Sequence, residues 1–156
     1  MIEESVESFI TQFKPYAAPV EVLPHVEGSP LLECVVGRTV IHLLERTSPY
    51  AARPGMGQVI INPTTLGLEP SAEAIKELLA PALSQLKVTG LVLERQEGAV
   101  IVDAGVPLVV TLFSDVPETL AAGDWVQFES ITPVHGFFVP AARRSPQQRA
   151  ADADSI

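Results

Sequence analysis

The stretch that decides the fold is LKVTGLVLERQEGAVIVDAGVPLVVTLFSDVPETLAAGDWVQFESITPVHGFFV, residues 86–139. Turn-forming residues such as Gly98, Gly105 and the segment 132–136 divide it into short runs rich in Val, Ile, Leu and Phe. Short apolar runs joined by Gly, Pro and Asp turns are typical of strands in a small barrel or a tightly curled sheet. The runs are VTGLVLER, AVIVDA, PLVVTLF, WVQFESI and GFFV.

Two helices are expected to flank these strands. Over residues 3–13, apolar side chains recur at helical spacing and form one stripe, which Lys14-Pro15 ends. Over residues 71–86, a serine near the start is a suitable N-cap and a leucine-rich stripe follows. Pro81 interrupts this second stripe, so we expect a kink or two abutting short helices there.

The N-terminal half also contains runs that resemble strands. Four prolines between residues 15 and 30 favour an extended segment, because proline cannot donate to a strand ladder. Asn62-Pro63 is typical of a turn that ends a strand. Strands are predicted over 31–36, 38–46 and 58–62, with at most an edge strand over 20–23.

These patterns predict an α+β fold, in which a mostly antiparallel curled sheet or small OB- or SH3-like barrel over about 86–139 carries two packed helices. With 156 residues, we expect one compact domain over 1–140. It would combine a helix-plus-strand half, 1–85, with the barrel-like half. The tail, 141–156, is polar, Ala-rich and aperiodic, and we expect it to be disordered.

The composition is that of an acidic protein with enough apolar residues for a core. The net charge is −9 and 47% of the residues are hydrophobic. An acidic surface repels nucleic acid and anionic membranes and favours a basic protein partner. The N-terminus, MIEESVESF, differs from a signal peptide and no apolar run is long enough to span a membrane, so a cytoplasmic protein is expected. The single cysteine, Cys34, lies in the apolar run LLECVV and is expected to be a small buried side chain.

The only tryptophan, Trp125, follows a Gly-Asp turn in the run GDWVQFE. This pattern resembles strands of OB-type and SH3-like barrels in general. If Val126 and Phe128 point into a barrel, Trp125 points outward, where OB-folds stack nucleic-acid bases; the opposite phase would bury it. The stretch 86–139 carries seven acidic residues against only two basic ones, so single-stranded nucleic-acid binding is an alternative that the charge disfavours.

A second candidate site combines Arg38, His42, Arg46 and Arg53. The first three share one face of the strand predicted over 38–46, and Arg53 lies in the glycine-containing loop that follows. Guanidinium groups and a histidine could together hold a carboxylate or a phosphate. The alternative is that these arginines pair with surface carboxylates.

No catalytic set or metal site is evident in the sequence. His25, His42 and His135 have no ligand spacing, and no nucleophile motif is present, so we expect neither a metal nor a cofactor. The excess of apolar strand residues suggests self-association into a homo-oligomer. The sequence therefore favours a non-enzymatic binding or assembly domain that acts through protein–protein contact. The alternatives are a nucleic-acid binder that uses Trp125 and a small-anion protein or enzyme that uses the arginine region.

Overall fold

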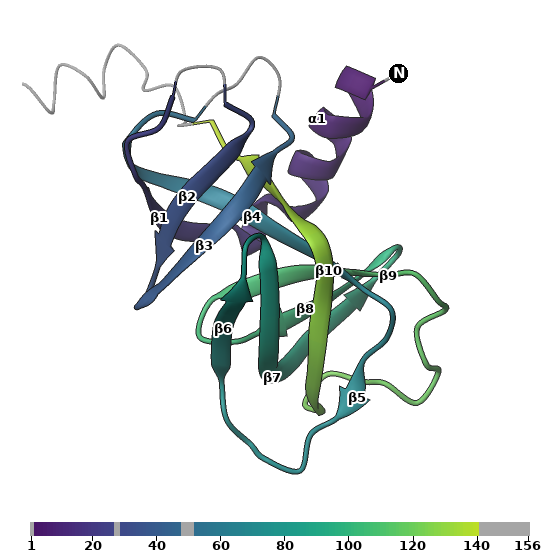
Figure 1. The fold of residues 1–156 in the computed structure, drawn as a ribbon. Coiled ribbons are helices and arrows are strands. Elements are labelled where there is room, and N and C mark those ends of the chain that lie inside the picture. The colour runs from purple at the N-terminus through teal and green to yellow at the C-terminus, as the bar shows by residue number, and fades with distance from the viewer. Residues whose placement is uncertain (1, 27–28, 48–51, 141–156) are drawn as a thin grey trace, which may run out of the picture.

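The computed structural model of the chain describes residues 2–26, 29–47 and 52–140, with side chains from Val6 onward. Strands dominate it, and one α-helix lies at its N-terminus (Figure 1). The elements are α1 (Ile2–Phe13), the 3-10 helix η1 (Lys14–Tyr16), β1 (Ala18–Val22), β2 (Leu31–Val36), β3 (Thr39–Glu45), β4 (Gly55–Thr65), β5 (Glu69–Pro70), β6 (Glu77–Ala82), β7 (Gln85–Gln96), β8 (Ala99–Asp103), β9 (Pro107–Leu112) and β10 (Trp125–Phe138).

Eight of the strands close into a mixed β-barrel, in the order β10-β3-β2-β1-β4-β9-β8-β7, with β7 pairing back onto β10. The pairings of β3 with β10 and of β4 with β9 are parallel, and the others in this ring are antiparallel. The short strands β5 and β6 extend the sheet from β10 and from β7. The predicted barrel is confirmed, but it takes strands from both halves of the sequence and not from 86–139 alone.

The long strands β4 and β10 also pair with each other, and this pairing divides the ring into two circuits. One circuit is β1-β2-β3-β10-β4 and the other is β4-β9-β8-β7-β10. Figure 1 shows β10 connecting two groups of strands: one consists of β7, β8 and β9, and the other of β1, β2, β3 and β4. Both halves of the chain therefore share one sheet.

The apolar side chains form an interior core and a second layer outside the barrel. The interior core takes alternate residues of the strands, including Leu32, Leu43, Ile61 and Val100. Outside, α1 places Val6 and Phe13 among residues of β4, β8, β9 and β10. This second layer explains why β8 and β9 read as continuous apolar runs, because strands buried on both faces lack alternation. The outward-facing strand residues in this layer are Ile60, Ala99, Ile101, Val109 and Phe137.

The predicted helix over 71–86 is wrong, and with it the α+β class with two packed helices. These residues form a loop, β6 and the start of β7. Leu78 pairs with Val88 across the β6–β7 hairpin, and Ser84 in its turn has a positive φ of 52°. Pro81 already weakened a helix here, and pairing with β7 outweighs the helical spacing of the leucines. Of the two predicted helices, only the one over 3–13 is confirmed, as α1.

The predicted turn at Asn62-Pro63 is also wrong, because β4 continues to Thr65. Pro63 lies where the β4–β10 ladder is interrupted, between the register pairs His135↔Asn62 and Ile131↔Thr64. Proline is tolerated at such a bulge because no ladder bond is needed from its nitrogen.

Two further expectations about strands need correction. The segment 132–136 was expected to be a turn, but it is a bend inside the single strand β10. The edge strand expected at 20–23 is β1, which pairs with both β2 and β4. Its proline, Pro19, lies in the part of β1 that pairs with β4 alone. The strands expected over 31–36 and 38–46 are confirmed as β2 and β3.

Among the described residues, no helix is long and apolar enough to cross a membrane. The predicted disordered tail, 141–156, lies outside the described residues, as do residues 48–51 of the loop after β3.

Candidate functional site

A groove forms beside β10 where the segment between β4 and β5 stands away from that strand. Thr65 of β4 is the register partner of Ser130, and Glu69 of β5 is the register partner of Gln127. Three residues of one segment therefore face two of the other, as in a β-bulge, and the segment around Gly67 stands away from β10. The Thr65 hydroxyl fixes this departure, because it donates to the Glu129 carbonyl at 2.8 Å and accepts from the Gly67 N–H at 3.3 Å.

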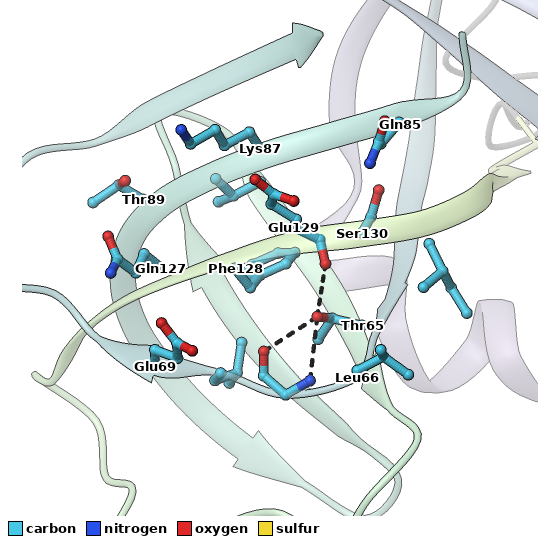
Figure 2. Close-up of a pocket in the computed structure, with 14 residues that line it drawn as sticks. Thr65, Leu66, Glu69, Gln85, Lys87, Thr89, Gln127, Phe128, Glu129 and Ser130 are labelled. Carbon is cyan, nitrogen blue, oxygen red and sulfur yellow. Dashed lines mark hydrogen bonds between the residues drawn. The ribbon is translucent and has the colours of Figure 1, made fainter. Parts of the chain in front are cut away.

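This groove has a volume of about 770 Å³ and runs over the outer face of β7 and β10 (Figure 2). Its side chains are mostly polar, and Figure 2 shows Gln127 beside Thr89 and Glu69 at one end. The ring of Phe128, which is only 6% exposed, lies beneath the gap that the departing segment leaves. The labelled lining residues are Thr65, Leu66, Glu69, Gln85, Lys87, Thr89, Gln127, Phe128, Glu129 and Ser130.

A smaller hollow of about 310 Å³ adjoins the groove at Trp125. The two share Leu68 and Glu69 in their linings, so they adjoin at β5, and we refer to them together as the depression. Trp125 is half-buried, while Val126 and Phe128 lie in the barrel core. Of the two phases that the sequence allows for Trp125, the structure shows the outward one. The other residues around the hollow are Pro70, Pro117, Thr119, Leu120, Asp124 and Val126.

Carboxylates outnumber cations along the depression. Among the described lining residues, the acids are Glu69, Asp124 and Glu129 and the one cation is Lys87, which is the register partner of Glu129. Among the described residues, neither Glu69 nor Glu129 has a cation within salt-bridge distance. The field in the depression therefore favours a cationic ligand.

Large apolar side chains stand exposed at the end of the groove opposite Trp125. Leu66 and Phe113 are each 70% exposed. They lie close together, because the Phe113 N–H donates to the Thr65 carbonyl at 3.0 Å and the Ser114 hydroxyl donates to the Leu66 carbonyl at 3.1 Å. The depression thus offers apolar contacts at both ends and polar groups between them.

The residues of the predicted anion site do not converge in the same way. Arg38 lies in the turn before β3, His42 on its outer face and Arg46 directly after it. The two arginines therefore flank β3, whose six steps from Thr39 to Glu45 span roughly 20 Å at ~3.3 Å per residue. One phosphate cannot contact both of them. His42 pairs with Glu33 across the β2–β3 ladder, with 3.3 Å between Nε2 and Oε2. Arg53 is exposed ahead of β4 and donates to the Ala52 carbonyl.

Other groups that carry chemistry are isolated in the fold. Burial raises the pKa of the Cys34 thiol to about 12, which keeps it protonated and unreactive. His135 lies beside Arg46, and burial together with this positive charge lowers the pKa of His135. The described residues contain no group of three or more His, Cys, Asp or Glu side chains placed to hold a metal ion.

No family model, curated protein or solved structure matches this chain. Function is therefore inferred from the side chains of the depression alone. Of its residues, the sequence pointed to Trp125. The sequence does not point to the polar residues around Trp125, because these are brought together only by the pairing of β10 with β5 and β7. They are Glu69, Lys87, Thr89 and Gln127. The alternation of polar residues in WVQFES is the one local signal of this outward face.

Proposed function

We propose that this chain is a non-enzymatic protein-binding domain, which holds an extended segment of a partner protein along the depression beside β10. The observation that carries the proposal is that the groove and the Trp125 hollow adjoin, since Leu68 and Glu69 line both. From Trp125 to Ile131 the depression follows seven residues of β10, whose six steps span roughly 20 Å at ~3.3 Å per residue. This length suits about six residues of an extended peptide.

The character of the depression supports a peptide over the other ligand classes. It is an open groove with exposed apolar side chains at one end, and such surfaces are typical of protein contacts. Its carboxylates disfavour single-stranded nucleic acid, even though Trp125 faces outward. Among the described residues, its lining contains neither histidine nor cysteine, so no Ser–His or Cys–His pair is formed there.

The proposal is tested by selecting hexapeptides from a displayed random library against the full chain. Selected peptides are then titrated while Trp125 fluorescence is followed with excitation at 295 nm. Gln127→Tyr places a bulky side chain on the groove floor, and we expect it to weaken binding by at least about tenfold. Gln58→Tyr adds the same side chain at an exposed position of β4 outside the groove and serves as the control.

Two results would overturn the proposal. Selected peptides could leave the emission of Trp125 unchanged, which would place their site elsewhere. They could also bind Gln127→Tyr as tightly as the wild type, which would exclude the groove floor.

Self-association through a different surface is a second candidate. Val40, Leu79 and Leu83 are exposed apolar side chains on neighbouring elements. Those elements are joined by hydrogen bonds of 3.0 Å from Thr39 Oγ1 to the Leu78 carbonyl and from Ser84 Oγ to the His42 carbonyl. A dimer at micromolar concentration that Leu83→Glu dissociates would support this candidate, and a wild type that sediments as a monomer would remove it.

A further inference from the structure

We propose that the hollow beside Trp125 is a socket for a single arginine side chain of the docked segment. This inference rests on the proposed function, since it assigns one subsite of the same depression. It names the chemistry of the partner: an extended peptide that presents a guanidinium group at the Trp125 end.

The size and walls of the hollow suit one long side chain. Its volume, about 310 Å³, is at the lower end of the range of ligand pockets, roughly 300–1,000 Å³. Its lining combines Trp125 with the apolar residues Leu68, Pro70, Pro117 and Leu120, of which Leu68 and Leu120 also pack on the interior core. Apolar walls can cover the methylene stem of arginine while its charged end reaches polar groups.

Two carboxylates in the hollow supply those polar groups. Asp124 accepts the Ala121 N–H at 2.9 Å through Oδ2, which leaves Oδ1 available. Glu69 has no cationic partner among the described residues. The groove's own cation, Lys87, lines the neighbouring groove and not the hollow. A cation that enters the hollow therefore meets two negative charges beside an aromatic ring.

This combination favours arginine over lysine. A guanidinium is planar, stacks on an indole face and donates paired hydrogen bonds to carboxylates. A lysine ammonium is more strongly hydrated and has no planar fork, so it gains less from the same surroundings.

The walls of the socket are already fixed in the free protein. Arg95 Nη1 donates to the carbonyls of Pro117, Glu118 and Leu120 at 2.9, 3.3 and 2.9 Å. The turn before Trp125 is fixed to β7, because the Gly123 N–H donates to the Val92 carbonyl and the Val92 N–H donates to the Asp124 carbonyl, both at 2.8 Å. A wall that needs no ordering on binding costs less entropy.

The test uses the full chain and three small probes: N-acetyl-arginine amide, N-acetyl-lysine amide and N-acetyl-citrulline amide. Each is titrated at constant ionic strength while Trp125 fluorescence is followed. We expect saturable binding of the arginine probe, weaker binding of the lysine probe, and no response to citrulline, which has nearly the same shape without the charge. Glu69→Gln should weaken binding of the arginine probe by roughly tenfold. Glu21→Gln, which removes an exposed acid of β1, should leave it unchanged.

The socket is overturned if citrulline binds as well as arginine, or if the arginine probe never changes the Trp125 signal. Neither result contradicts the proposed function, which is tested separately with the selected hexapeptides and the Gln127→Tyr variant. The chain's own arginines are tested with a full-length variant in which Arg143, Arg144 and Arg149 are replaced by glutamine. If the Trp125 emission of this variant differs from that of the wild type when no probe is present, the chain itself supplies the cation. That result would overturn the assignment to a partner protein.

Discussion

The backbone N–H of Val134 donates a hydrogen bond of 2.9 Å to the hydroxyl of Ser84, which lies in the β6–β7 turn. The same hydroxyl donates to the His42 carbonyl of β3 at 3.0 Å. Ser84 therefore joins the hairpin of one circuit to β3 and to the bend of β10. Both ends of the bond to Val134 are buried, so no water replaces a lost partner there.

Ser84→Ala should lower the free energy of unfolding by about 1–3 kcal/mol, because it leaves the buried Val134 N–H without an acceptor. Urea unfolding followed by circular dichroism measures this change. Ser114→Ala removes an exposed hydroxyl and should change the stability by less than about 0.5 kcal/mol. Equal effects of the two substitutions would contradict the role assigned to Ser84.

Gly90→Ala should be strongly destabilising, because β7 approaches β8 too closely for a side chain. A Cβ at Gly90 would lie 2.5 Å from the Asp103 carbonyl oxygen and 2.8 Å from Val102 Cγ1. Overpacking of this kind costs about 1–3 kcal/mol, measured as a lower urea midpoint. Gly57→Ala is the matched control, since a Cβ there meets nothing within 4 Å and the change should be neutral or slightly stabilising.

The contact between Phe9 of α1 and Phe137 of β10 should appear as a coupling energy. The two rings are stacked with their centroids 4.3 Å apart. A double-mutant cycle with Phe9→Ala and Phe137→Ala should give a coupling of about 0.5–1.5 kcal/mol in urea unfolding. A parallel cycle with Phe9→Ala and the exposed Phe113→Ala should be additive within about 0.5 kcal/mol. A coupling of zero in the first cycle would show that α1 is not held on the barrel as described.

His135 should make the protein less stable in mild acid. Burial and Arg46 lower the pKa of His135 below its ordinary 6.5, so the unfolded chain binds more protons than the folded one as the pH falls through this range. The free energy of unfolding should therefore fall between pH 7.5 and pH 5.5, and it should fall less in His135→Gln. His25→Gln, a second partly buried histidine, should retain the loss seen in the wild type.

Local patterns predicted the elements whose burial is simple. The strands β2 and β3 each have one buried face, formed by Leu32 and Cys34 in β2 and by Ile41 and Leu43 in β3. The predicted ends of both strands agree with the observed ends to within one residue. The α1 stripe was equally clear, because Val6 and Phe13 pack on one partner surface. The phase of Trp125 stayed open in the sequence, and only the burial of Val126 and Phe128 in the structure decides it.

Long-range pairing decided the elements that local patterns missed. Leu78 and Leu79 fit a helical stripe, but Leu78 and Ala80 also have the two-residue spacing of a strand face, and pairing with β7 selects the strand. Pro63 is compatible with β4 only because the ladder to β10 is interrupted opposite it. The depression could not be predicted for a similar reason. Glu69 and Trp125 are far apart in the sequence and are joined only by the short β5–β10 ladder.

The membership of β10 in both circuits has a consequence for the order of assembly. This strand follows every other strand that the structure describes, and neither circuit can close without it. During synthesis from the N-terminus, the residues of β1 to β4 and of β7 to β9 are made before those of β10. At that stage both rings are open, and the backbone groups of β3, β4 and β7 that bond to β10 have no partner strand. Insertion of residues 125–138 then closes the two rings in a single event, so the halves of the barrel should gain protection against hydrogen exchange together and not one after the other.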